Sequence, residues 1–167
     1  SDAQLNWASA VGGAAELCAD RAAEMTAILT GETPAPSGLP LDPELRWGWL
    51  FGLVSSGNAG VDEIEAEAAR DATASGRTAR LAALAALPEA SVRREGWHAA
   101  WEDLSLTNDH LDATIRGIRA GQSRELIAAF DGDYFDRILP AWRSRSIEIA
   151  ARLVRGLFPS TTDTSAV

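Results

Sequence analysis

The chain has 167 residues, the size of a single domain, and its 46% hydrophobic and 23% charged residues are typical of a globular protein and exclude a disordered or fibrous one. The net charge of -9 repels nucleic acid and anionic lipid, so we expect no nucleic-acid partner and no membrane partner. No apolar run reaches the roughly 18 residues that cross a bilayer, and the first residues lack a signal-peptide pattern.

The apolar residues follow a helical spacing nearly everywhere, and no segment alternates like a strand, so we predict an all-α protein. The predicted helices occupy, in chain order, residues 3–15, 20–30, 43–57, 60–70, 73–87, 89–103, 107–118, a short helix capped by Ser123, then 134–139 and 142–158. Pro140 is expected to end the helix 134–139. Asp42 followed by Pro43 has the pattern of an N-cap and a first helical residue.

The spacing of the helices indicates how they stack. From residue 43 onward they form pairs of roughly 30 to 35 residues, the length on which helical solenoids repeat. We therefore expect stacked antiparallel helix pairs, either a HEAT-like α-solenoid or a superhelical bundle. In the helix 60–70, Ile64 and Ala68 lie on the apolar side, and Glu67 is expected in solvent.

The helix 43–57 is the most hydrophobic of the predicted helices. Its Trp, Phe, Leu and Val side chains cover most of the circumference, which predicts burial on two sides, as for an inner helix of a solenoid or bundle. The remaining arc carries Gly48, Gly52 and Ser55, a shallow groove where we expect another helix to pack closely.

Arg46 projects from the apolar arc of this helix. A buried guanidinium without a partner is too costly, so Arg46 is expected to pair with a carboxylate, to donate to backbone carbonyls, or to face a water-filled cavity. The first two possibilities make it a structural residue, and the third makes it a candidate for contact with a substrate.

The sequence contains no visible catalytic set. A zinc peptidase site needs two histidines on one helix face, as in HExxH, and here His98 has only Glu102 at i+4, which is too few ligands. The segment 131–136 offers Asp131, Asp133 and Asp136 but lacks the glycine and the final glutamate of a calcium-binding EF-hand loop, so we interpret it as a loop and helix cap. We expect neither a metal site nor a catalytic residue in this chain.

Nucleophiles and phosphate-binding residues are equally scarce. Cys18 lies in a helical run of small residues, where a core position is the plain reading. Because Cys18 is the one cysteine, an intramolecular disulfide is excluded. This fits a cytoplasmic location, which we expect, and it fits equally well an exported protein that has no disulfides. The chain has no lysine, and the C-terminal Arg143, Arg145, Arg152 and Arg155 are interpreted as a solvated helix face or a basic strip.

The order of several sequence words resembles a known family. The chain contains, in succession, LTGETPAPSGLPLDPELRWGWLFGLVSSG, DEIEAEAARDATASGRTARLAALAALP, GWHAAW and RSRSIEIAARLVRGLFPS. This succession resembles the C-terminal helical domain of actinobacterial aminopeptidase N, a zinc metallopeptidase of the gluzincin group, and that domain is similar to the C-terminal domain of endoplasmic-reticulum aminopeptidases. The resemblance covers about residues 1–160 and depends on long-range order rather than on a catalytic motif.

The resemblance implies a domain of a larger chain, consistent with the missing initiator Met. Residues 1–160 would form the helical C-terminal domain, and 161–167 a disordered tail. Zinc, the HExxH ligands and the motif that holds the substrate's amino terminus would belong to a catalytic domain outside this sequence. The partner of this chain would be that catalytic domain. The chain would cover it and enclose a cavity for peptides, with Arg46 as the candidate for contact with the cavity.

Two other hypotheses remain open. The chain has the pattern of a free-standing α-solenoid adaptor that binds a peptide or a partner protein on a concave surface. A small helical enzyme would need convergent titratable groups, which the sequence does not display. An HExxH motif upstream in the parent reading frame would distinguish the aminopeptidase domain from the adaptor.

Overall fold

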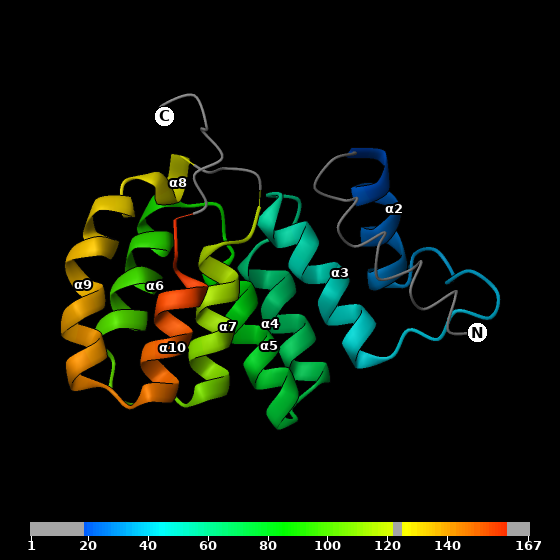
Figure 1. Ribbon diagram of the computed structural model, residues 1–167. Coiled ribbons are helices and arrows are strands. Elements are labelled where there is room, and N and C mark those ends of the chain that lie inside the picture. Colours follow the sequence, from blue (N-terminus) through cyan, green and yellow to red (C-terminus); the bar gives the residue numbers. More distant parts are fainter. Residues whose placement is uncertain (1–18, 122–124, 160–167) are drawn as a thin grey trace.

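The computed structural model describes residues 19–121 and 125–159, and within these ranges the chain forms nine helices and no strand (Figure 1). The helices are α2 (Ala19–Thr30), α3 (Pro43–Ser55), α4 (Val61–Arg70), α5 (Ala74–Ala85), α6 (Ala90–Glu102), α7 (Asn108–Ile118), α8 (Glu125–Ala128), α9 (Asp131–Ser144) and α10 (Ile147–Gly156). The predicted helix 3–15, Cys18, Ser123 and the tail 161–167 lie outside the described residues.

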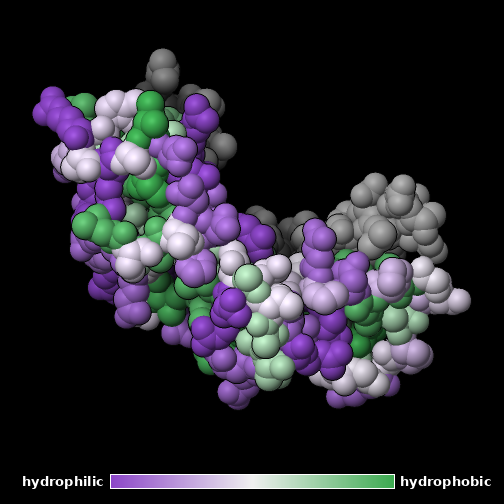
Figure 2. All heavy atoms as spheres, turned by 90° about the horizontal axis from the view of Figure 1, so that it is seen from below, coloured by the Kyte–Doolittle hydropathy of each residue, from purple (hydrophilic) through white to green (hydrophobic). Residues whose placement is uncertain are grey.

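The helices stack in two layers. In the first layer α3 packs on α5, α5 on α7 and α7 on α10. In the second, α4 contacts α3 and α5, α6 contacts α5 and α7, and α9 contacts α10. The predicted all-α fold of stacked helix pairs is confirmed. Seen from below, the molecule is bent, with a hollow between the end that carries α2 and the end that carries α9 (Figure 2).

Local sequence signals place α3. The Asp42 carboxylate accepts a hydrogen bond from the Leu45 amide at 2.8 Å, and Pro43 occupies the first helical position, as predicted. Gly57 ends the turn after the helix with a φ of 76°, a conformation that favours glycine. These two signals fix where the most hydrophobic helix begins and ends.

The core is divided into separate clusters rather than gathered in one centre. One face of α3 packs against α2 through Leu45, Trp49 and Leu53. The opposite face packs against α4 and α5 through a cluster that includes Trp47 and Leu50. The predicted burial of this helix on two sides is therefore confirmed. A third cluster joins α6, α7, α9 and α10.

Helix α9 corrects the prediction for the C-terminal part. The helix continues through Pro140 to Ser144, so Pro140 does not end it, and the last helix begins at Ile147 rather than at residue 142. A proline removes the hydrogen bond to the carbonyl four residues earlier, here that of Asp136. Both residues are exposed, so water can satisfy that carbonyl, and the helix persists.

A buried arginine fixes the ends of two helices. Arg93 on α6 is 1% exposed, and its guanidinium donates only to backbone carbonyls: those of Ala86 at 2.7 Å and Leu87 at 3.1 Å after α5, and those of Gly117 and Ile118 at the end of α7. The carbonyl ends of helices carry partial negative charge, which offsets the cost of burying this cation. Arg93 thereby holds α5 and α7 in register.

Candidate functional site

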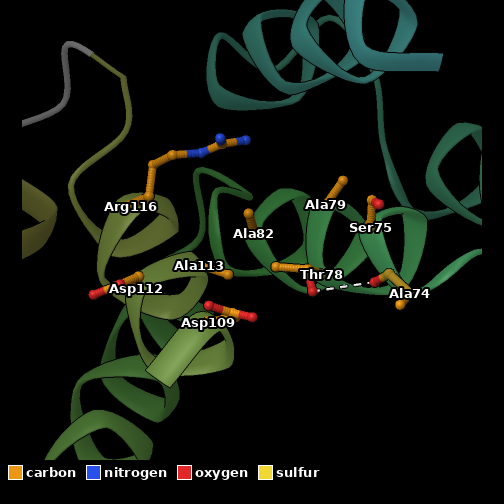
Figure 3. A pocket seen from close by; sticks show the side chains of 9 residues that line it. All are labelled: Ala74, Ser75, Thr78, Ala79, Ala82, Asp109, Asp112, Ala113 and Arg116. Carbon is orange, nitrogen blue, oxygen red and sulfur yellow. Dashed lines mark hydrogen bonds between the residues drawn. The ribbon is translucent and has the colours of Figure 1, made fainter. Parts of the chain in front are cut away.

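A groove runs along α5 on the free face of the first layer. It consists of two hollows, of about 540 and about 980 Å³, that share the lining residues Ser75, Ala79 and Arg116. The first hollow lies between α5 and α7 (Figure 3), and the second lies between α3 and α5. Because they share residues, we treat them as one open groove, the α5 groove, lined from within residues 42–49, 71–82 and 109–116.

The floor of the α5 groove is formed by small side chains on α5, among them Ser75, Ala79 and Ala82. The same helix packs very closely on α7, where a Cβ added to Gly117 would lie 2.5 Å from the Ala82 carbonyl oxygen and 2.5 Å from the Ala85 Cβ. Small residues therefore serve two purposes on α5. They allow the close contact with α7, and they leave a shallow floor that the main chain of a ligand can approach.

The α3 wall of the groove is held rigidly by the Trp47 indole. Its Nε1 donates to the Asp71 carboxylate at 2.9 Å, and the Thr73 hydroxyl donates to the same carboxylate at 2.6 Å. The hydrogen bond from Thr73, and then that from Trp47, lower the pKa of Asp71. The Asp71 carboxylate, favoured in its ionised form, thus links the end of α4, the start of α5 and α3.

Gly48 corrects the prediction of close packing along the glycine arc of α3. The residue is exposed, and a Cβ added there would have no atom within 4 Å, so Gly48 faces the open α5 groove. Gly52 is buried, and the Ser55 end of the arc is approached closely, because a Cβ on Gly121 would lie 2.7 Å from the Ser55 carbonyl oxygen. What approaches there is the turn after α7 rather than a helix.

On the α7 side, Arg116 extends its side chain toward α3 (Figure 3). Its guanidinium carbon lies 4.4 Å from the centroid of the Phe51 ring, a cation–π contact. Protein atoms around the groove partly desolvate this cation and lower its pKa. Asp112, one turn earlier on α7, is paired with Arg152 at 3.0 Å instead. Sequence reasoning did not single out Arg116, because nothing in its spacing distinguishes it from a solvated arginine.

Arg46 lies behind the groove in a buried ion pair. Its Nε and Nη2 donate to the two oxygens of Glu67 at 2.7 and 2.6 Å, and Nη2 also donates to the Leu29 carbonyl at 3.1 Å. Arg46 is 9% exposed and Glu67 6%, so Glu67 is not in solvent as predicted. The expectation that a carboxylate and carbonyls satisfy Arg46 is confirmed, and contact of Arg46 with a substrate stays a prediction.

The residues considered as metal ligands are occupied in other contacts. His98 Nδ1 lies 3.2 Å from Glu102 Oε1, and Arg137 donates to the same oxygen at 2.9 Å. The hydrogen bond from Arg137, and then that from His98, lower the pKa of Glu102. Asp133 accepts from Trp97 and from Arg137, both at 2.6 Å. Within residues 19–121 and 125–159, no three His, Cys, Asp or Glu side chains are grouped to hold a metal ion.

The acidic segment 131–136 belongs to α9 rather than to a loop. Asp131 and Asp133 lie in the first turn of this helix, where acidic side chains favour the positive end of the helix dipole. The four C-terminal arginines do not act as one strip. Arg145 donates to the Trp101 carbonyl, whereas Arg152 binds Asp112. No helix in the described part of the chain is long and apolar enough to cross a membrane.

Stacked helix pairs with a groove along the free face of one layer define a helical domain of the solenoid or bundle class. The sequence matches the family described as "ERAP1-like C-terminal domain" over residues 1–167. It is also 37% identical over 160 residues to aminopeptidase N of Streptomyces lividans. That alignment covers 96% of this chain and 18% of the relative. The chain belongs to the ERAP1-like C-terminal domain family, as its resemblance implied.

Proposed function

We propose that this chain is the C-terminal helical domain of a zinc-dependent aminopeptidase, and that it covers the catalytic domain and forms part of the peptide chamber. Residues 1–160 make up the domain in this proposal, and 161–167 a disordered tail. The observation that carries the proposal is the α5 groove, an open channel with a small-residue floor on the face that no other described helix covers. Family membership and the relative named aminopeptidase N support it.

Zinc in this proposal belongs to the catalytic domain outside the chain. The described residues do not fit the metal, because His98 and Glu102 form a pair with Arg137 and no third ligand is near. In this proposal the zinc ligands and the groups that activate water belong to that catalytic domain. The work left to this chain is to bind and orient the peptide at a distance from the reacting bond. A cytoplasmic location stays a prediction.

The α5 groove can be blocked without disturbing the core. Gly48 is exposed and its added Cβ meets nothing within 4 Å, so Gly48→Trp places a large side chain in the groove. Gly132 on α9 is equally open but lies outside the groove, so Gly132→Trp is the matched control. Both variants are made in the complete parent enzyme. Steady-state kinetics are then measured with an aminoacyl anilide and with peptides of increasing length.

We expect Gly48→Trp to lower kcat/KM for longer peptides by about tenfold, equivalent to about 1.4 kcal/mol of lost binding. Turnover of the short anilide should be unchanged, because that substrate does not reach the groove, and Gly132→Trp should leave both substrates unaffected. Equal effects of Gly48→Trp on anilide and peptides, or no effect on either, would contradict the chamber proposal. A parent gene without an upstream HExxH motif would favour the adaptor hypothesis instead.

A further inference from the structure

The outer side of α9 is apolar, although no other described helix covers it. Helix α9 lies at the edge of the stack (Figure 1), and its inner side packs on α6 and α10 through Tyr134 and Ala141. On its outer side Phe135 is 58% exposed, Leu139 58% and Trp142 52%. We call these three residues the α9 stripe, because their i, i+4, i+7 spacing places them in one row along the helix.

The apolar surface at this end of the molecule is wider than α9 alone. The Tyr134 ring contacts the Phe135 ring, with centroids 5.1 Å apart, and also the ring of Phe158, just after α10, at 5.8 Å. Phe158 is 55% exposed, so the apolar surface continues from α9 to α10. In Figure 2 hydrophobic side chains reach the surface at this end. The end helix of a stack normally has a polar outer side, so this surface indicates that another body covers it.

Two unpaired charges border the α9 stripe. Asp136 and Arg143 are exposed, and within the described part of the chain neither forms an ion pair. They lie seven residues apart, which is two turns, and therefore on one side of the helix next to the stripe. Asp133 and Arg137, by contrast, pair with each other at 2.6 Å. The stripe is thus flanked by an available negative charge toward the start of α9 and an available positive charge toward its end.

This pattern of apolar and charged residues is self-complementary. In an antiparallel pair of identical helices, each residue faces the residue that lies equally far beyond the two-fold axis. The midpoint of Asp136 and Arg143 lies between residues 139 and 140, and that of Phe135 and Trp142 between residues 138 and 139. Leu139 lies between these midpoints, which are about 1.5 Å apart along the helix. One axis near Leu139 therefore places apolar side chains on apolar side chains and each acid opposite an arginine.

We propose that the α9 stripe is an interface between two copies of this chain, in which the two α9 helices pack antiparallel about a two-fold axis near Leu139. In this dimer Leu139 packs on its symmetry mate, and Phe135 packs on Trp142 of the other copy. Asp136 of each copy forms an ion pair with Arg143 of the other. The dipoles of the two helices are opposed in this arrangement, which also favours it.

The size of the surface fits a weak but specific dimer. The side chains of the α9 stripe and of Phe158 expose roughly 100 Å² each, so two copies would bury about 800 Å² of apolar surface. With the flanking charges the interface reaches about 1,000 Å², near the lower limit for specific association. We therefore expect a Kd on the order of 10 to 100 µM at about 0.15 M salt, which screens the net charge of -9 on each copy.

The test measures the mass of the full 167-residue chain by sedimentation equilibrium, from about 2 to about 300 µM, a range that brackets the expected Kd. Asp136→Arg and Arg143→Asp are made singly and together in one chain, with Arg94→Asp at an exposed position on α6 as their control. Leu139→Asp places two carboxylates at the axis, and Val61→Asp, at a 48% exposed position on α4, is its control. Circular dichroism first shows that each variant is folded.

We expect each single charge reversal to weaken the dimer by at least about tenfold, because two symmetric attractions become two repulsions. The double reversal in one chain should dimerise like the wild type, and so should an equimolar mixture of the two single variants, because an arginine again faces an aspartate at both positions. Leu139→Asp should be monomeric over the whole range. Arg94→Asp and Val61→Asp should dimerise like the wild type.

A wild-type chain that stays monomeric at every concentration would overturn the inference. So would single reversals whose effect neither the double reversal nor the mixture restores, or a control variant that weakens the dimer as much as Leu139→Asp. The same variants in the complete parent enzyme distinguish a second copy from the catalytic domain as the body that covers the stripe, and a parent that remains monomeric over this range would also overturn the inference. The proposal does not depend on the peptide chamber, which the kinetics of Gly48→Trp test separately.

Discussion

The buried pair of Arg46 and Glu67 provides a quantitative test of how α3 is held. Arg46→Leu removes both hydrogen bonds to Glu67, at 2.7 and 2.6 Å, and leaves a carboxylate that is 6% exposed. Removal of one partner of a buried pair costs about 3 to 5 kcal/mol. Arg70 lies 3.8 Å from Glu67, but its side chain is 65% exposed, so water screens most of its compensation. We expect a loss of about 3 kcal/mol in the free energy of unfolding.

The assay is urea unfolding monitored by circular dichroism at pH 7, with a thermal melt as a second measure. A loss of about 3 kcal/mol corresponds to a fall of about 6 to 12 °C in Tm for a chain of this size. The control is the double variant Arg46→Leu with Glu67→Leu, which removes both charges and should lie within about 1 kcal/mol of the wild type. A single variant that loses under about 1 kcal/mol, or a double variant as unstable as the sum of both single changes, would refute the reasoning.

Three further predictions use matched pairs or pH. Trp49→Ala should cost about 3 to 5 kcal/mol in urea melts because Trp49 is 3% exposed, whereas Trp142→Ala, at a 52% exposed position, should cost less than about 1 kcal/mol; similar losses would contradict the two-sided burial of α3. Gly117→Ala should destabilise by about 1 to 3 kcal/mol through its clash with α5, and Gly48→Ala should stabilise by about 0.5 to 1 kcal/mol; a neutral Gly117→Ala would show that α5 and α7 separate easily. Hydrogen bonds lower the pKa of Asp71, so its carboxylate stabilises the fold above its unfolded pKa near 4 and this contribution disappears as the pH falls through the lower folded pKa. The stability gap between wild type and Asp71→Asn should therefore shrink from about pH 5 to about pH 2, and a constant gap would exclude this role.

The all-α fold was predictable because each helix carries its own signals. Asp42 and Pro43 start α3, Gly57 ends its turn, and the apolar spacing within each helix shows which side is buried. Burial of α3 on two sides followed from the breadth of its apolar arc alone. The ends of a helix and its buried side depend on residues that lie within a few turns of one another in the same helix. A single sequence shows these residues directly.

The misplacement of Glu67 shows what the same pattern conceals. On a helical wheel Glu67 lies three residues after Ile64 and therefore near the apolar side of α4, the signal that would have marked it as the partner of Arg46. Its charge led to the prediction of a solvent position. The continuation of α9 through Pro140 was hidden for a different reason, since it depends on whether one carbonyl faces water, which sequence spacing does not reveal.

Arg116 and Arg93 illustrate the limit for sites. Both lie on helices, yet Arg93 is 1% exposed and joins two helix ends, whereas Arg116 projects over a groove. The difference arises from tertiary contacts between segments far apart in the chain, such as Arg93 with Gly117 and Arg116 with Phe51. Periodicity assigns a side to each residue of a helix but does not say which helix will face that side.

The division of the core explains why an open groove can exist on so small a domain. Each helix of the first layer buries apolar side chains against its neighbours and against the second layer, so stability does not require the remaining face to be covered. That face is then free to carry Gly48, the small residues of α5 and Arg116. The arrangement also couples stability to binding, because the tight contact at Gly117 sets the spacing of α5 and α7 and thereby the width of the groove between them. If the groove holds peptides as proposed, a substitution that separates these helices should weaken that binding even when it touches no residue that lines the groove.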